Sequence, residues 1–320
     1  MSHFLLLAVG NDYDNELQFF YEGQEDPSIC TFKSMQKDLL DDFETGTMRA
    51  ILMPDGTHKL PHDESFAVKK GSDSFFTVSY EPPEGTKKVE IPFKEFYASF
   101  EEFAKFSGYE KDPVLEEYGY YYNPHAKWDW YQVGGRWSGF FKLKKGHKGL
   151  RGTPGLMTPA CPEGYADSAR IEDIDFEGMI KEATDKANNL WDTIESVVKG
   201  REIPAFKDFS ALYPEDLHKA RTAYFNHSVI QDLHKANIKF FFDFKETFGS
   251  SRSEYIKKTA NSVCTPLAFL KDGNWYEKGQ MGWFGFSQDQ LSEEEWSLFI
   301  KAQLDQLDPK TFLTAIDCHI

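Results

Sequence analysis

Apolar residues along the chain recur with the periods that strands and helices require. The run from His3 to Val9 is almost wholly apolar and ends at a Gly-Asn-Asp turn, which predicts a buried first strand. Further strands are expected at Met48 to Met53 and at Ser74 to Tyr80. From Phe93 to Phe106, phenylalanine and tyrosine recur at helical spacing, so we expect an amphipathic helix whose aromatic stripe belongs to the core.

The middle of the chain has the pattern of helices. Apolar residues from Phe176 to Lys199 fall on one side of a long helix, which is expected to stop at a basic last turn followed by Gly200. Another helix is expected to begin at Pro214 and to run towards Asn237. Residues 144–166, in contrast, are rich in Gly, Pro and Lys without periodicity, which indicates a long loop.

Strands return in the last part of the sequence. A hairpin is expected over Leu267 to Tyr276, around an Asp-Gly turn, and another strand at Gly282 to Phe286. Ser292 and Glu295 have the spacing of a capping box and predict the start of a helix. Phe312 to Ile320 predicts a final strand.

This order of elements predicts an α+β fold with antiparallel sheets and a helical insertion. We expect an N-terminal α+β half in residues 1–160, a helical insertion or cap in residues 161–262, and a C-terminal β-rich segment in residues 263–320 that completes the core.

The segment from Asn123 to Phe141, NPHAKWDWYQVGGRWSGFF, concentrates aromatic and charged residues. Gly134 and Gly135 form a pair that can take positive φ in a two-residue hairpin loop. The sequence therefore predicts a hairpin in which the chain returns from Arg136 and places Trp128 opposite Phe141.

The two faces of the expected hairpin differ in character. Strand alternation would place Trp128 and Trp130 on one face and Lys127, Asp129 and Tyr131 on the other. Aromatic pairs stabilise hairpins without any function, so the tryptophans are interpreted chiefly as structural. The polar face is the candidate functional surface.

The end of the chain supplies candidate partners for this surface. Asp317 and His319 are two residues apart on an expected strand, so they face the same way, and a carboxylate can orient an imidazole for acid–base work. If the last strand lies beside the hairpin, these residues join a common site. The candidate catalytic residues are His125, Lys127, Asp129, Asp317 and His319.

Two chemistries remain open for such a site. Cations beside a histidine suit cleavage of a phosphodiester without a metal, through charge stabilisation and proton transfer. A quartet of His125, Asp129, Asp317 and His319 would instead suit a divalent metal. Spacing in the sequence does not decide between them, and we assign no metal and no cofactor.

A short internal similarity links two parts of the chain. The pattern Trp-Tyr-x-x-Gly occurs at Trp130 and again at Trp275, and each copy is followed by a further tryptophan, Trp137 or Trp283. A true repeat would imply a duplicated β-rich half. The candidate ligand-binding residues are Trp130, Tyr131, Arg136, Trp137 and Trp283.

Composition narrows the function classes. The net charge of −16 repels phosphate backbones, so general DNA or RNA binding is not expected. Four scattered cysteines lack the spacing of a disulfide framework or a zinc finger. No apolar run is long enough to span a membrane. The sequence also lacks a Walker motif, GxSxG and a Rossmann fingerprint, and a soluble protein of a reducing cytoplasm is predicted.

Several segments resemble a poorly characterised family of bacteriophage-encoded proteins. They are NPHAKWDWYQVGGRWSGFFKLK, IDFEGM, NWYEKGQMGWFG and the final DCHI, in that order. The resemblance implies an accessory phage product that acts in the host cytoplasm, where counter-defence is a common role. The expectation of ferredoxin-like units rests partly on this resemblance.

Three functions follow as hypotheses. The first is binding of a small, anionic, nucleotide-derived ligand by stacking and by Lys127 and Arg136. The second is cleavage of such a ligand, with His125 or His319 as general acid or base. The third is inhibition of a host protein by the acidic surface. The sequence leaves a homo-oligomer open.

Overall fold

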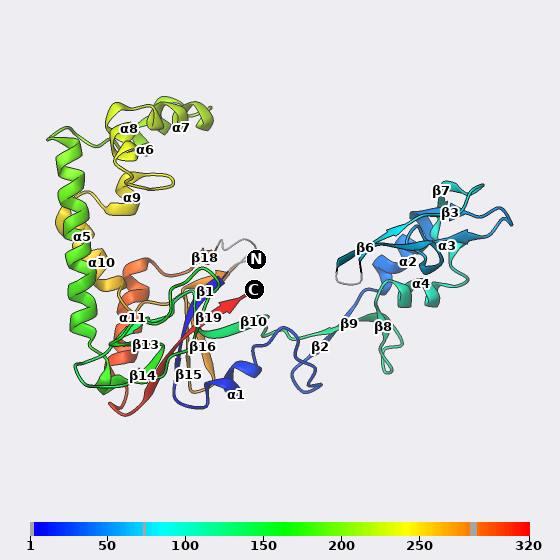
Figure 1. Cartoon of the computed structure of the whole chain (residues 1–320), viewed down its shortest axis with the longest axis horizontal. Coiled ribbons are helices and arrows are strands. Elements are labelled where there is room, and N and C mark those ends of the chain that lie inside the picture. The colour runs from blue at the N-terminus through cyan, green and yellow to red at the C-terminus, as the bar shows by residue number, and fades with distance from the viewer. Residues whose placement is uncertain (1–2, 73–74, 282–286) are drawn as a thin grey trace. The chain divides into compact units, whose positions relative to one another are not determined.

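The computed structural model (Figure 1) describes residues 3–72, 75–281 and 287–320. Within them the chain forms eleven α-helices and several sheets, which confirms a mixed α and β architecture. The chain divides into two compact units, one of Met1–Tyr21 with Lys127–Ile320 and one of Glu22–Ala126. These boundaries differ from the three segments expected from the sequence.

A seven-stranded mixed sheet is the centre of the larger unit. Its order is β12 (Thr153–Pro154), β10 (Trp130–Gly135), β19 (Phe312–His319), β1 (His3–Val9), β15 (Ala268–Lys271) and β16 (Asn274–Glu277), and β14 (Ser168–Arg170) also pairs with β19. The pairs β1–β15 and β10–β12 are parallel, and the other pairs are antiparallel. The sequence had predicted antiparallel sheets, and the two parallel pairs show that this sheet is mixed.

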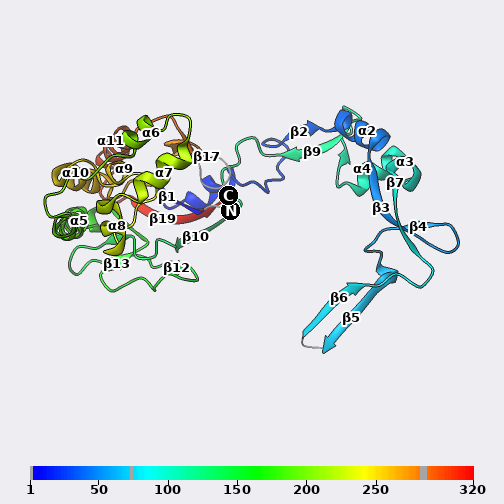
Figure 2. The same cartoon turned by 90° about the horizontal axis from the view of Figure 1, so that it is seen from above.

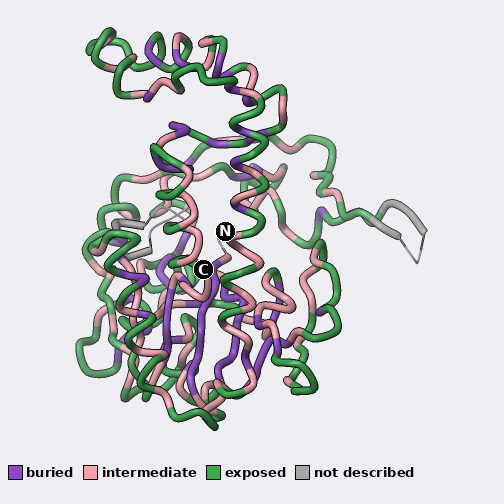
Figure 3. The backbone as a smooth tube through the Cα atoms, turned by 90° about the vertical axis from the view of Figure 1, so that its left-hand side faces the viewer, coloured by how far each residue is buried: buried purple, intermediate pink, exposed green. Residues whose placement is uncertain are grey.

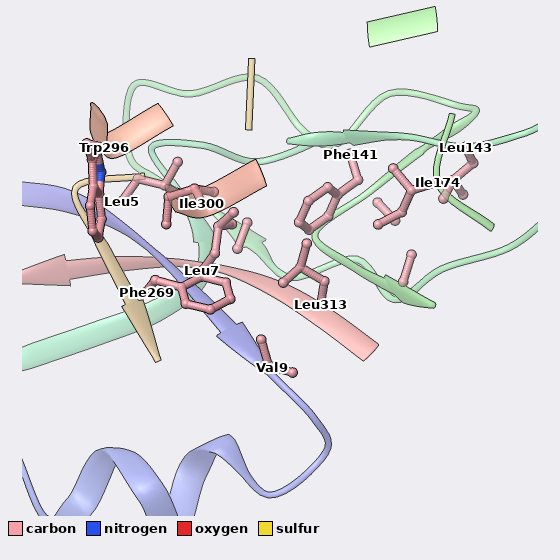
Figure 4. Close-up of a cluster of buried hydrophobic side chains, with 13 residues drawn as sticks. Leu5, Leu7, Val9, Phe141, Leu143, Ile174, Phe269, Trp296, Ile300 and Leu313 are labelled. Atoms are coloured by element: carbon pink, nitrogen blue, oxygen red, sulfur yellow. The ribbon is translucent and has the colours of Figure 1, made fainter. Parts of the chain in front are cut away.

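Both faces of this sheet are buried. Leu5, Leu7 and Val9 of β1 point into a core beneath α5 (Phe176–Val198) and α11 (Glu293–Asp305), which Figure 4 shows in close-up. Phe4 and Leu6 point to the other face, where a second core includes residues next to α1 (Tyr13–Gln18). Figure 3 shows the resulting buried strands. Burial on both faces explains the nearly continuous apolar run of β1.

The helical part of the larger unit is built on α5. Asp175 caps its start, and Lys199 ends it in the left-handed conformation with φ 52°, which confirms the predicted helix. The following helices are α6 (Phe206–Leu212), α7 (Leu217–Phe225), α8 (Ser228–Lys235), α9 (Phe244–Phe248) and α10 (Arg252–Ser262). Figure 1 shows α6 to α9 around the end of α5. The single helix expected from Pro214 is two helices, because His227 has an extended backbone.

The smaller unit contains three small sheets and three helices among its described residues. The sheets are β2 (Thr31–Ser34) with β9 (Tyr118–Tyr122) and β8 (Glu110–Lys111), then β4 (His58–Lys59) with β3 (Thr47–Leu52) and β7 (Lys87–Pro92), and the hairpin β5 (Ala67–Ser72) with β6 (Phe75–Tyr80). Figure 2 shows this hairpin projecting from the rest of the unit. Beside them lie α2 (Gln36–Thr45), α3 (Phe93–Phe96) and α4 (Phe100–Phe106).

The aromatic stripe from Phe93 to Phe106 forms α3 and α4, and not one helix as predicted. The chain becomes extended at Tyr97, and the Ser99 hydroxyl then accepts the Glu102 N–H at 3.2 Å, which caps a new helix. The stripe still forms the core of this unit, except for Phe106, which is exposed.

The C-terminal predictions correspond closely to β15, β16, α11 and β19. Ser292 and Glu295 form the predicted capping box at the start of α11. The strand expected at Gly282 to Phe286 lies outside the described residues, between β17 (Gly279–Met281) and β18 (Ser287–Asp289). Along the described parts of the chain, no helix has the length and apolar character needed to cross a membrane.

The hairpin predicted around Gly134-Gly135 is wrong. β10 pairs with β19 and β12, and the segment after it forms β11 (Phe141–Lys142), which pairs with β13 (Tyr165–Ala166). Long-range pairing with the last strand of the chain replaces the local hairpin, because β19 offers a long apolar strand to which β10 can add.

Candidate functional site

Three adjacent strands bring His3, His319 and Trp130 into one row. β19 lies between β10 and β1, with Trp130 opposite His319 and His319 opposite His3. Directly opposed residues of antiparallel strands project from the same face. The ring centroids of His3 and His319 are 5.0 Å apart, and those of His3 and Trp130 are 5.9 Å apart. The row therefore gathers two imidazoles and an indole.

A buried carboxylate holds the first imidazole. Asp317 lies diagonally from His3 on the neighbouring strand, a spacing that side chains can bridge. Its Oδ1 is 2.7 Å from His3 Nδ1, and its Oδ2 accepts the backbone N–H of Arg136 at 2.9 Å. Asp317 is only 1 % exposed. Both oxygens are thus hydrogen-bonded, as a buried carboxylate requires.

A second carboxylate holds the other imidazole. Asp129 Oδ1 lies 2.5 Å from His319 Nδ1, and the Asp129 backbone N–H donates to the His319 carbonyl oxygen at 2.9 Å. The backbone contact fixes the residue immediately before β10 beside the end of β19. The Asp129 side chain is 40 % exposed, so this pair lies at the surface of the unit.

The two pairs have the same chemical consequence. A carboxylate only accepts hydrogen bonds, so each imidazole donates from Nδ1 and presents Nε2 on its other side. Within residues 3–72, 75–281 and 287–320, neither Nε2 has a hydrogen-bond partner. The carboxylates also fix the orientation and the tautomer of each ring. Each ring can therefore act as an oriented acid or base.

The Gly-Gly sequence serves this arrangement and not a hairpin loop. Gly134 and Gly135 have φ of 82° and 51°, a region that favours glycine. A Cβ on Gly135 would overlap the Asp317 carboxylate, and one on Gly134 would lie 2.7 Å from Asp167 Oδ2. The two glycines let the chain pass against two buried carboxylates, one of which orients His3.

Asp167 fixes the loops behind the site. It is fully buried, and its carboxylate accepts the N–H groups of Gly139 at 2.5 Å and Gly152 at 2.8 Å. The Gly155 N–H donates to the Gly135 carbonyl oxygen at 2.8 Å. The loop that follows β10 is thereby held against the residues that support His3.

The aromatic residues of the segment are divided differently from the prediction. Trp128 is buried on the opposite face, where its indole N–H donates to the Leu17 carbonyl oxygen at 3.0 Å. Tyr131 packs against it with ring centroids 4.9 Å apart and bonds to Asp14. Trp130 points to the histidine face and is 44 % exposed. The predicted Trp128–Trp130 face is therefore wrong.

Burial of Tyr131 has an electrostatic effect. Desolvation, and then the hydrogen bond to the Asp14 carboxylate, raise the pKa of its phenol well above the usual range. The phenol therefore stays protonated. Tyr131 does not share a polar row with Asp129, because its ring packs with Trp128 on the face opposite the histidines.

The remaining predicted residues have varied positions. Lys127 Nζ forms an ion pair with Glu277 Oε1 at 2.8 Å. Arg136 is exposed, and among the residues that the structure describes its guanidinium forms no hydrogen bond or ion pair. Trp137 packs against the core of the histidine face. His125 belongs to the smaller unit, and Trp283 lies outside the described residues.

The predicted pairing of Asp317 with His319 is also wrong. Both residues face the same side, as predicted, but Asp317 binds His3 while His319 binds Asp129. His125, the remaining member of the alternative metal quartet, belongs to the smaller unit. Where the chain is described, no group of three or more His, Cys, Asp or Glu side chains is arranged to hold a metal ion.

Sequence analysis missed His3. It begins a strand that is otherwise apolar, so its polar side chain was the available signal. A histidine at the start of the first strand and one at the end of the last strand become neighbours only when these two strands pair antiparallel with this register.

Comparisons of the chain with known protein families, with curated proteins and with solved structures found no match.

Proposed function

We propose that the protein is an acid–base enzyme that cleaves a phosphodiester in a small nucleotide-type ligand. The site consists of His3 with Asp317 and His319 with Asp129. One observation carries the proposal: the two imidazoles have ring centroids 5.0 Å apart, and each bonds a carboxylate through Nδ1.

Cleavage of a phosphodiester needs two proton transfers at one phosphorus. A base removes a proton from the attacking oxygen, and an acid gives a proton to the leaving oxygen. Each transfer contributes roughly 10²–10⁴-fold to the rate. Two oriented imidazoles this close can serve the two oxygens of a single phosphoryl group, whereas one histidine would have to serve both.

Neighbouring groups support a nucleotide as the ligand. The exposed indole of Trp130 offers a surface for a base to stack on, within 5.9 Å of the His3 ring centroid. Arg136 is exposed and its backbone N–H binds Asp317, so the chain carries a cationic side chain at a residue next to the site. Lys127, which the sequence suggested for the same role, is neutralised by Glu277.

Binding without cleavage is the second candidate. Two imidazolium groups beside Trp130 would hold a phosphate and a base even if no bond is broken. Such a protein would sequester a nucleotide signal, which accords with the counter-defence role implied by the resemblance to phage proteins. Four expectations from the sequence stay predictions. They are inhibition of a host protein by the acidic surface, the ferredoxin-like type of the fold, a duplication within it, and a homo-oligomer.

A ligand panel separates cleavage from binding. The purified full-length protein is incubated with cyclic dinucleotides and cyclic ADP-ribose isomers, and the mixture is separated by chromatography before and after heat denaturation. Altered ligand supports cleavage, and intact ligand that denaturation releases supports sequestration. If every ligand stays free and unchanged, both candidates are wrong.

Matched variants tie the activity to the site. His3→Ala and His319→Ala should each reduce turnover by about 10²-fold or more. His147→Ala is the control, because His147 also bonds a carboxylate, that of Asp173 at 2.5 Å, but lies outside the site. Equal loss in all three variants would remove the link between the two-histidine site and the activity.

A further inference from the structure

The two histidines provide proton transfer but no nucleophile. On the described part of the histidine face, the residues of the two rows are Trp130, His319 and His3, then Gln132, Asp317 and Leu5. None of these is a hydroxyl or thiol side chain. Cys318 lies between Asp317 and His319 but points into the opposite core, where it is fully buried. These two described rows therefore offer no attacking oxygen, which leaves the substrate or water to supply it.

We propose that the attacking oxygen is the 2′-hydroxyl of the substrate, so that the substrates are ribonucleotide phosphodiesters with 3′–5′ linkages. This inference rests on the proposed acid–base function of the same site. It names the substrate class and the reaction: an internal transesterification that leaves a 2′,3′-cyclic phosphate.

The proton balance matches two imidazoles. One neutral imidazole takes the 2′-hydroxyl proton at Nε2 while the O2′–P bond forms. The P–O5′ bond breaks, and the other imidazole, which starts as imidazolium, gives its Nε2 proton to O5′. The products are a 2′,3′-cyclic phosphate and a 5′-hydroxyl. The two rings exchange protonation states, and the reaction consumes no water and no further reagent.

Both carboxylates are already engaged in holding the rings. Asp317 is buried, and its two oxygens accept from His3 and from the Arg136 backbone. Asp129 accepts from His319. Each ring also has only one nitrogen left for substrate. A nucleophile that the substrate itself holds in place needs no further group, and such intramolecular attack has effective molarities of about 10⁵–10⁸ M.

The indole next to the histidines selects for a base near the cleaved bond. Trp130 is in the same row as His3 and His319, so a base stacked on it is attached to a ribose whose phosphate reaches the two imidazoles. The net charge of −16 disfavours long polyanions, which points to dinucleotides and cyclic oligonucleotides as substrates in preference to long RNA.

Paired ribo- and deoxyribonucleotides test this inference. The full-length protein is given 3′,5′-cyclic diadenylate and uridylyl-adenosine, each beside an analogue that lacks the attacking 2′-hydroxyl. The products are identified by chromatography and mass spectrometry. We expect the ribo compounds to yield 2′,3′-cyclic phosphates and 5′-hydroxyls. The deoxy analogues should react at least about 10³-fold more slowly, because they lack the intramolecular nucleophile.

The outcomes separate this inference from the proposed function. If ribo and deoxy compounds are cleaved at similar rates, or if the first product carries oxygen from ¹⁸O-labelled water, the enzyme is a hydrolase and only the 2′-hydroxyl inference is wrong. If no compound in either panel is cleaved, both are wrong. His319→Ala purified in the same way should show the loss of about 10²-fold or more that is expected above. Full activity in that sample would assign the cleavage to a contaminating ribonuclease and overturn the inference.

Discussion

His3 and His319 lie directly opposite each other on β1 and β19, with ring centroids 5.0 Å apart, and each donates from Nδ1 to a different aspartate. A pair of neighbouring histidines is unremarkable in a core, but here two separate carboxylates orient the rings. In the proposed function one ring acts as the acid and the other as the base. Three variants test how the rings are held, and a fourth tests the burial of Tyr131 on the opposite face.

Asp129→Asn should lower turnover without unfolding the protein. The amide keeps the size of the side chain but can also donate to Nδ1, so it no longer fixes the tautomer of His319, and a loss of about 10²–10⁴-fold is expected. Because the Asp129 side chain is 40 % exposed, the change in unfolding free energy should stay small. The measurement is kcat against pH, with urea unfolding alongside.

Asp173→Asn is the matched control for this variant, since Asp173 holds His147 at 2.5 Å outside the site. Loss of activity in Asp173→Asn, or normal activity and an unaltered pH profile in Asp129→Asn, would show that His319 does not depend on its carboxylate.

Asp317→Asn should lower both stability and turnover. The buried carboxylate accepts from the His3 ring and from the Arg136 N–H, and an amide can accept at only one of these positions. At least one hydrogen bond to a charged acceptor is lost or replaced by a weaker neutral one, which costs about 1–3 kcal/mol of unfolding free energy. Urea unfolding measures this cost. Asp185→Asn, at an exposed i,i+4 ion pair on α5, should change stability by less than about 1 kcal/mol; a similar loss in both variants would contradict the role of Asp317.

Gly135→Ala should be more harmful than Gly10→Ala. Both glycines have positive φ, 51° and 94°, so both alanines meet backbone strain of about 1–2 kcal/mol. Around Gly10, however, there is nothing within 4 Å of the added Cβ, whereas at Gly135 it overlaps the Asp317 carboxylate. We expect Gly135→Ala to lower turnover in addition to stability, and Gly10→Ala to leave turnover unchanged. Equal unfolding free energies and equal activities of the two variants would exclude this packing.

The stability that buried Tyr131 contributes should be lost at high pH. Its pKa is raised by burial and by Asp14, so the phenol stays protonated in the folded chain, while in the unfolded chain it releases its proton near pH 10. A raised folded pKa gives stability that is present below pH 10 and is lost above it, by at most about 1.4 kcal/mol per pH unit. Urea unfolding at pH 9 and pH 11 should show a smaller loss in Tyr131→Phe than in the unchanged protein. An equal loss in both would mean that Tyr131 titrates as it does in the unfolded chain.

Local patterns were sufficient for several elements. The apolar run of β1, the stripe of α5 and the capping box of α11 each lie within one segment, and each was predicted nearly at its observed bounds. One failure was also local in origin. Helical spacing across Phe93 to Phe106 concealed the break at Tyr97, because the same stripe packs whether it is carried by one helix or two.

The site was only partly visible in the sequence. Asp129, Asp317, His319 and Trp130 were identified by residue type and spacing, and the structure brings these four together. The aspartate that each histidine binds was wrongly assigned. Lys127 instead pairs with Glu277, Tyr131 bonds to Asp14, and Trp137 packs against the core.

What the sequence by itself determined is which segments become strands and helices and which residues can carry acid–base chemistry, because periodicity and side-chain chemistry are local properties. Only the tertiary structure decided that β10 adds to β19 and that β1 lies on the other side, since strand pairing depends on hydrogen bonds and burial between distant segments. That pairing placed His3 beside His319 and gave the Gly-Gly sequence its role against Asp317, for which a local hairpin had been predicted.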